Sequence, residues 1–257
     1  MQTAGGVLVD TSVWSHAVVG ETVFETLPGL ENKLALIRAK KETTNPKLKR
    51  EIECLPTIAR LAREGVVLLY TYDELVNETM HKTGLLTHLF GGVKLCRAQA
   101  PVRRGLFSSN DLSEFIRPYS KSGKTGPLAD FCEWLIKYYS DKLLSIPYIQ
   151  GKLTDCEIEN LRKIDILRSI CKPPLDTNHF GDAFHLWAAE INNLQFLTTD
   201  SKFIRALSNT CHMKIRHKPI LPSQLLHNMG IAERDPMPFK YGRRYTLNGQ
   251  MYDEEEV

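Results

Sequence analysis

The chain has 257 residues, of which 42% are hydrophobic and 25% charged, and its formal net charge is +3 at pH 7. These values predict one large or two small soluble globular domains, and they exclude a bulk polycation while allowing a local basic patch. Because no apolar run approaches the roughly 18 residues of a spanning helix, and no basic-then-apolar start marks a signal peptide, we expect no membrane contact and a cytoplasmic protein.

Short apolar runs that end at polar residues predict buried strands over residues 6–10, 66–70 and 196–200. A fourth strand is expected over residues 213–221, where a proline favours an edge position. Helical segments lie between these strands along the chain. Strands that alternate with helices predict an α/β fold with a mostly parallel central sheet.

The helical segments are recognised by their apolar period and by their start and stop signals. Residues 31–64 are strongly basic and are expected to be helical, with a break at Asn45-Pro46 and an end at Gly65. The further helices are expected over residues 73–82, 127–144, 154–171, 181–192 and 222–226. The polar residues 229–257 are expected to form a poorly ordered C-terminal tail. Six scattered cysteines without a CxxC pair predict free thiols rather than metal ligands.

Aspartates stand at the ends of two strands and at the start of one helix. Asp10 follows the first strand, Asp200 ends the run 196–200, and Asp182 opens the helix 181–192. Because α/β folds place their sites at the carboxyl edge of the sheet, we expect these three carboxylates to lie close together. Gathered carboxylates without a cationic partner usually hold a divalent metal ion. An aspartate at a helix start can also serve as a cap, and Asp200 can do both.

The segments that carry these acids resemble a known family. Residues 9–14 (VDTSVW) look like the opening of PIN-domain nucleases, the family that includes VapC-type toxins. Residues 181–189 (GDAFHLWAA) are similar to the family's helix with the third acid, and residues 198–203 (TTDSKF) to its strand end with the fourth. Residues 222–226 (PSQLL) resemble its closing segment. The short motifs occur in the family's order, which strengthens the resemblance.

The resemblance implies a three-layer α/β/α fold over residues 1–228. Its matched core covers residues 5–16, 66–80 and 178–228. Residues 17–65 and 81–177 would then be long, largely helical insertions, and residues 229–257 a tail outside the domain.

The family's second acid falls in a segment that offers two glutamates. Glu74 and Glu78 are four residues apart and therefore share one helical face. Glu74, followed by a leucine, fits the toxin pattern, whereas Glu78 fits relatives with apolar residues shortly before the acid. We favour Glu78 and keep Glu74 as the alternative.

The chemistry that these residues support is phosphodiester hydrolysis assisted by two divalent ions. Mg²⁺ or Mn²⁺ prefers hard oxygen ligands, which the four carboxylates supply. Asp10 would be the shared ligand, Asp182 and Glu78 would complete one site, and Asp200 would hold the second ion or orient its waters. The hydroxyls of Thr11, Ser12 and Thr198 would support these ligands by hydrogen bonds. By resemblance, the products carry a 5′-phosphate and a 3′-hydroxyl.

The expected activity is therefore that of a metal-dependent endoribonuclease. Single-stranded or looped RNA is the expected partner, with Lys202, Arg103 and Arg104 as candidate phosphate contacts. A protein inhibitor or antitoxin and a homodimer are further partners that the resemblance suggests. The alternative function is a PIN-fold scaffold in an RNA-processing or defence assembly. An aspartyl phosphatase fits poorly because Ser12 occupies the position of its second acid.

His185, one turn beyond Asp182, is interpreted first as a packing residue and second as a site-lining one.

Overall fold

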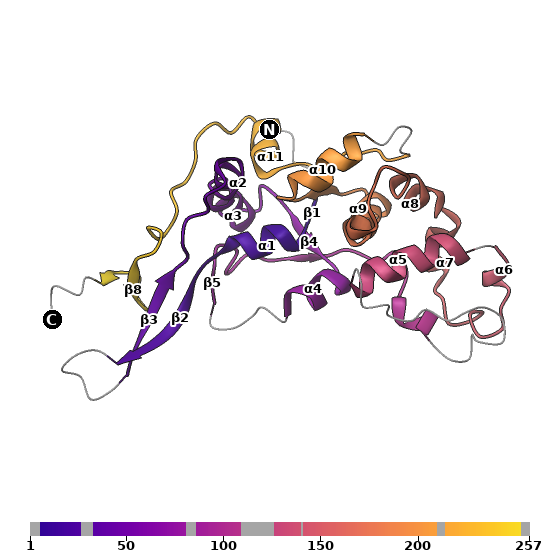
Figure 1. Ribbon diagram of the computed structural model, residues 1–257, viewed down its shortest axis with the longest axis horizontal. Coiled ribbons are helices and arrows are strands. Elements are labelled where there is room, and N and C mark those ends of the chain that lie inside the picture. The colour runs from indigo at the N-terminus through magenta and orange to yellow at the C-terminus, as the bar shows by residue number, and fades with distance from the viewer. Residues whose placement is uncertain are drawn as a thin grey trace.

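The protein is described here from a computed structural model, which covers residues 6–26, 33–80, 86–108, 126–139, 141–209 and 214–252 (Figure 1). The strands are β1 (Val7–Val9), β2 (Val18–Thr26), β3 (Lys33–Ala39), β4 (Leu69–Thr71), β5 (Leu86–His88), β6 (Cys96–Arg97), β7 (Gln195–Leu197), β8 (Arg244–Thr246) and β9 (Met251–Tyr252). The helices are α1 (Thr11–Ala17), α2 (Pro46–Ile52), α3 (Leu55–Arg63), α4 (Asp73–Met80), α5 (Pro127–Tyr138), α6 (Asp141–Leu144), α7 (Asp155–Arg162), α8 (Asp165–Ile170), α9 (Phe180–Ile191), α10 (Ser201–Ser208) and α11 (Pro222–Asn228), with 3-10 turns η1 (Arg104–Ser108) and η3 (Thr177–His179).

A four-stranded parallel sheet in the order β6-β4-β1-β7 forms the centre of the fold. In β1, Leu8 pairs with Tyr70 of β4 on one side and with Phe196 of β7 on the other. Strands are therefore confirmed at the three places expected from the sequence, although β4 begins only at Leu69 and β7 ends at Leu197. A mixed α/β fold with a parallel sheet is confirmed as well. Because all these strands run in the same direction, the residues that follow β1 and β7 meet at one edge of the sheet.

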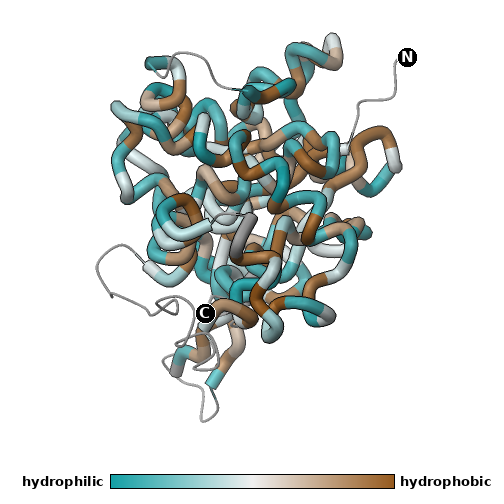
Figure 2. The backbone as a smooth tube through the Cα atoms, turned by 90° about the vertical axis from the view of Figure 1, so that its right-hand side faces the viewer, coloured by the Kyte–Doolittle hydropathy of each residue, from teal (hydrophilic) through white to brown (hydrophobic). Residues whose placement is uncertain are grey.

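Both faces of this sheet are buried, as parallel sheets require. Side chains alternate along β1. Leu8 enters a core shared with α5 and α9, whereas Val7 and Val9 enter a second core shared with α3 and α11. Trp187 of α9 is fully buried in the first core, as expected. Figure 2 shows hydrophobic and hydrophilic stretches alternating along the helices, which is typical of helices with one buried face.

A second, antiparallel sheet in the order β5-β2-β3-β8-β9 corrects two expectations. Residues 33–39 form a strand rather than the start of a basic helix, so the segment 17–65 is not largely helical. Residues 244–246 and 251–252 form strands, so the expectation of a poorly ordered tail is wrong for this part of 229–257; residues 253–257 lie outside the described ranges. The β2, β3 and β8 strands extend away from the helical body (Figure 1).

The physical reason for these corrections is pairing between residues far apart in the sequence. Ile37 faces Thr22 on β2 and Tyr245 on β8, and both Ile37 and Tyr245 are buried. Lys, Leu and Ala in 33–39 favour a helix when considered alone, but cross-strand packing decides the outcome here. The five-stranded sheet thus joins the chain segments near residue 37 and residue 245.

Smaller differences concern the boundaries of elements. The helix expected over 154–171 is divided into α7 and α8, and the one over 127–144 into α5 and α6. In place of a strand over 213–221, the described part of that segment contributes a single bridge between Ile220 and Leu197. The capping box of Thr154 and Glu157 is confirmed.

The described cysteines are free thiols, as expected, and Cys211 lies outside the described residues. Within the described ranges, no helix has the length and apolar character needed to span a membrane.

Candidate metal centre

Asp10 lies directly after β1 and caps the following helix α1. Its Oδ1 accepts the Thr11 N–H at 2.8 Å, which satisfies one of the free amides at the helix start. Its Oδ2 accepts hydrogen bonds from the hydroxyls of Thr198, at 2.8 Å, and Ser12. The side chain is thereby held in one orientation, and the residue is only 3% exposed.

The same two hydroxyls tie the end of β1 to the end of β7. Ser12 Oγ lies 3.1 Å from Thr198 Oγ1 and accepts the Thr199 N–H at 3.1 Å. Thr198 Oγ1 accepts the Asp200 N–H at 3.0 Å. The segments that carry Asp10 and Asp200 are therefore fixed relative to each other, as expected for residues that follow neighbouring parallel strands.

Asp182 and Asp200 come together with a histidine. His179, Asp182 and Asp200 each offer one ligand atom, and these three atoms lie within 4.8 Å of one another. His179 Nδ1 is 3.3 Å from Asp182 Oδ2. Asp200 also caps α10, because its Oδ1 accepts the amides of Lys202 at 2.7 Å and Phe203 at 3.0 Å. The capping role considered from the sequence is thus present at this corner.

The electrostatic surroundings of Asp182 disfavour its charge. Burial, together with the nearby Asp10 and Asp200 carboxylates, raises the pKa of Asp182 to about 6, against the opposing effect of His185 and His179. A carboxylate confined among other carboxylates is stabilised by any cation that binds between them. Such perturbed groups concentrate at functional sites.

Glu78 reaches the centre from α4. Its Oε2 accepts the Thr11 hydroxyl at 2.6 Å and lies 3.3 Å from His185 Nε2. His185 Nδ1 is in turn 2.6 Å from the Tyr72 hydroxyl. His185 is 2% exposed, so it both packs in the core and contacts a candidate ligand. Burial acts to lower the pKa of His185, but the hydrogen bond and charge of Glu78 outweigh it and raise the pKa.

Glu74 has a different surrounding. Its Oε2 forms an ion pair with Arg104 Nη2 at 3.1 Å. Burial raises the pKa of Glu74 even though Arg104 opposes the shift. Of the two glutamates, Glu78 is the one that lies beside Asp182 and His185, whereas Glu74 is paired with Arg104. The expected contact of Arg104 with phosphate stays a prediction.

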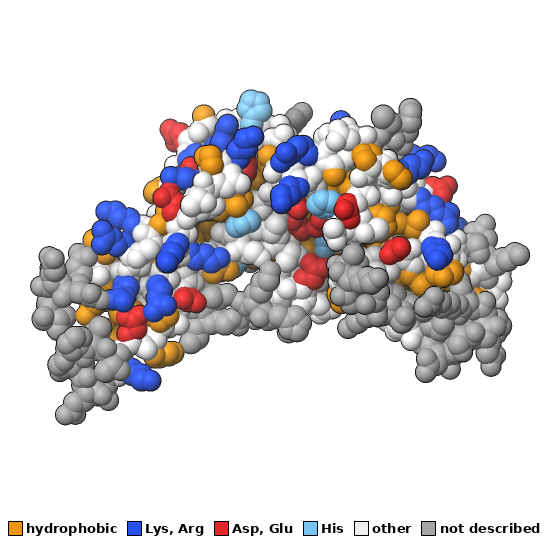
Figure 3. Space-filling view, viewed as in Figure 1, with side chains coloured by type: hydrophobic (Ala, Val, Ile, Leu, Met, Phe, Trp, Pro, Cys, Tyr) orange, Lys and Arg blue, Asp and Glu red, His pale blue; other side chains and the backbone are white. Residues whose placement is uncertain are grey.

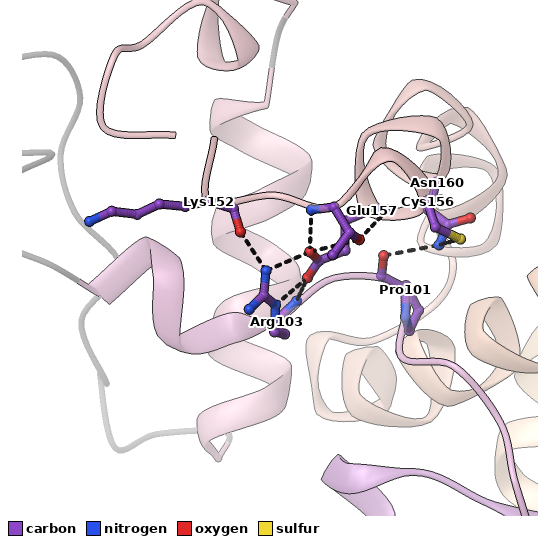
Figure 4. Close-up of polar contacts among 7 residues, drawn as sticks. Pro101, Arg103, Lys152, Cys156, Glu157 and Asn160 are labelled. Atoms are coloured by element: carbon purple, nitrogen blue, oxygen red, sulfur yellow. Dashed lines mark hydrogen bonds and ion pairs between the residues drawn. The ribbon is translucent and has the colours of Figure 1, made fainter. Parts of the chain in front are cut away.

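Arg103 is also engaged by the protein itself (Figure 4). Its Nε and Nη2 donate to the two carboxylate oxygens of Glu157, each at 2.8 Å, and its backbone N–H donates to the same carboxylate at 3.0 Å. Thr154 donates to Glu157 as well. This clamp holds the loop before η1 against the start of α7. Arg103 is thus held by a structural ion pair, and its contact with phosphate stays a prediction.

Two hollows open beside the acids. A small one of about 130 Å³ is lined by Glu78, Asp182, His185 and the start of α5. A larger one of about 720 Å³ is lined by Ser12, Thr199, Asp200 and Lys202 among others, so Lys202 does lie beside the centre. Figure 3 shows Asp, Glu and His side chains gathered near the middle of one face, with Lys and Arg side chains beside them.

Tyr72 belongs to this centre although the sequence did not assign it, and His179 lies there as well. His179 precedes Asp182 by three residues, a spacing that puts side chains on one helical face and was the available signal. Tyr72 gave no signal, because its contact with His185 depends on how α4 packs against α9. The set of carboxylate oxygens with one imidazole suits a divalent cation. No protein-family model, curated protein or solved structure matches the chain.

Proposed function

We propose that this protein is a divalent-metal-dependent endoribonuclease with a PIN-like core. The observation that carries the proposal is the convergence of Asp10, Asp182 and Asp200 at one edge of the parallel sheet, joined by Glu78 from α4. Within the described residues, no lysine or arginine forms an ion pair with any of the three aspartates. Their partners are hydroxyls, backbone amides and a histidine, which leaves the negative charge to be neutralised by bound cations.

Each of these residues has a distinct proposed role. Asp10 would be the shared ligand, Asp182 and Glu78 would complete one ion site, and Asp200 with His179 would form the other. Mg²⁺ or Mn²⁺ held by these residues would supply an activated water and neutralise charge on the phosphate. Ser12 and Thr198 hold the Asp10 carboxylate in place. Thr11 and His185 are positioning residues that orient Glu78, because both contact its carboxylate.

The proposed architecture is the three-layer α/β/α arrangement of the PIN family. It is supported by the burial of both faces of the parallel sheet and by the position of β1 inside it. RNA in single-stranded or looped form is the proposed substrate. A protein inhibitor, a homodimer and a cytoplasmic location belong to the same proposal.

The test is cleavage of RNA by the purified full-length chain. We expect cleavage with Mg²⁺ or Mn²⁺ and none after addition of EDTA or in Asp10→Asn. The matched control is Asp165→Asn, an aspartate in the first turn of α8 that is outside the centre and should leave cleavage unchanged. Cleavage that survives both EDTA and Asp10→Asn would overturn the mechanism. Undiminished cellular function of the Asp10→Asn, Asp182→Asn double variant would favour the scaffold function instead.

A further inference from the structure

The larger hollow, of about 720 Å³, forms a groove beside Asp200 between two helices that are distant in the sequence. Helix α2 contributes Lys47 and Arg50, and helix α10 contributes Lys202 and Arg205. In each helix the two cations are three residues apart, so they share one face. Four positive side chains thus line a groove that Asp200 also lines.

These four cations are not paired with acidic side chains of the described residues. None of them forms an ion pair with another described residue, and all four are exposed. Their neighbours behave differently: Lys49 of α2 pairs with Glu42, and Arg60 of α3 pairs with Asp235 at 2.9 Å. The groove therefore keeps its positive charge available for an anionic partner.

Hydrogen bonds anchor α2 beside the groove, and both helices carry a side-chain cap at their start. Glu51 of α2 is only 8% exposed and accepts the backbone N–H and the hydroxyl of Ser223, each at 2.8 Å, which fastens α2 to the first turn of α11. Asn45 caps α2, accepting the Lys47 amide at 3.1 Å, and Asp200 caps α10. Cations on fixed helices bind a ligand with less loss of conformational entropy than cations on loops.

We propose that this groove binds the backbone of one strand of RNA, with Lys47, Arg50, Lys202 and Arg205 contacting successive phosphates. This inference rests on the proposed nuclease function. Clustered unpaired cations are the electrostatic feature that phosphate chains recognise. The groove volume lies within the range of about 300–1,000 Å³ that holds one drug-sized ligand, which is room for a short stretch of single strand.

The position of Asp200 connects the groove to the chemistry. Asp200 lies in the acid cluster with Asp182, and it also accepts the backbone amide of Lys202 at 2.7 Å. A phosphate bound by Lys202 is therefore close to a candidate metal ligand. Helix α2 belongs to residues 17–65, outside the segments that resemble PIN nucleases. The side of the groove that α2 forms therefore comes from a segment outside that resemblance.

The experiment measures binding in EDTA, where cleavage cannot occur. A fluorescein-labelled single-stranded RNA of about 16 nucleotides is titrated with the full-length chain at several salt concentrations. We expect Lys47→Gln/Arg50→Gln and Lys202→Gln/Arg205→Gln each to weaken binding roughly tenfold at low salt and to reduce the slope of log K against log salt by about 1.4, since each phosphate contact contributes about 0.7. The matched control, Lys137→Gln/Arg162→Gln, removes the same charge from α5 and α7 and should bind as the wild type.

Three outcomes overturn the inference. The groove variants could bind like the control pair, all three pairs could lose affinity equally, or a duplex of the same length could bind as tightly and depend on the same residues. The nuclease proposal fails separately, if the wild type does not cut RNA with Mg²⁺ or Mn²⁺. Loss of binding in the groove variants of a non-cutting protein would support the groove and reject the nuclease.

Discussion

Glu157 and Asp182 each occupy the third position of a helix, in α7 and α9, but their surroundings move their pKa values in opposite directions. Burial disfavours the charge of Glu157, yet hydrogen bonds from Arg103 and Thr154 lower its pKa to about 2. Burial and the Asp10 carboxylate raise the pKa of Asp182 to about 6. Because the helix start favours a negative charge in both cases, the difference comes from the neighbours brought by the fold.

The two acids differ in what surrounds and neutralises their charge. Glu157 receives its counter-charge from Arg103, so its region is complete without any other molecule (Figure 4). Asp182 is surrounded by Asp10, Asp200 and His179, and a bound cation is what would stabilise its charge. Substitution at the two positions should therefore change different properties of the molecule.

The largest contrast is expected in catalysis. Asp182→Asn removes a direct candidate ligand, and it should reduce RNA cleavage more than about 100-fold, since loss of a residue that only supports a ligand costs about 10–100-fold. Glu157→Gln should change the rate no more than about twofold. The measurement is the cleavage rate with Mn²⁺ at neutral pH, and similar losses in both variants would contradict the comparison.

The next effect is on stability, where Glu157→Gln rather than Asp182→Asn should be the damaging substitution. Glu157→Gln leaves Arg103 without its carboxylate partner and should lower the free energy of unfolding by about 1–2 kcal/mol at neutral pH, because solvent screens the half-exposed Arg103. Because the folded pKa of Glu157 is lowered to about 2, its stabilisation is complete above its unfolded pKa of about 4.3 and is lost as pH falls toward 2. Urea unfolding of wild type and variant should therefore converge near about pH 2. If the free energies of unfolding of wild type and variant differed by the same amount at every pH, the ion pair would be rejected as the cause.

Asp182→Asn should stabilise the metal-free protein. The folded pKa of about 6 lies above the unfolded value of about 3.9, so ionisation of Asp182 costs stability as pH rises between these values. Removing the charge should raise the free energy of unfolding by about 2 kcal/mol at about pH 8, and by much less at about pH 4. Thermal unfolding in EDTA measures this gain. A variant less stable than the wild type at the higher pH would show that the carboxylate is structural.

The smallest contrast is between the two glutamates of α4. Glu78→Gln should slow cleavage at least about tenfold, because it alters a carboxylate held by Thr11 and His185. Glu74→Gln alters a carboxylate paired with Arg104 and should leave the rate within about twofold. Cleavage rates of the two variants decide the question, and a larger loss in Glu74→Gln would reverse the assignment.

The parallel sheet and its aspartates were predictable because their signals are local. Three apolar runs and the polar residues that end them indicate β1, β4 and β7, and parallel pairing then brings Asp10 to Asp200. The second sheet was not predictable, because the burial of Ile37 depends on Tyr245, far along the chain. The same limit applies to Arg103, because its charge alone does not indicate that Glu157 is its partner. It also applies to Tyr72, which contacts His185 only because distant segments pack together.

Calorimetric titration with Mn²⁺ near neutral pH tests most directly whether the acids at the sheet edge hold divalent ions. We expect the wild type and Glu157→Gln to bind Mn²⁺ alike, and Asp10→Asn and Asp182→Asn to lose binding. No binding by the wild type, or equal binding by Asp182→Asn, would contradict this expectation.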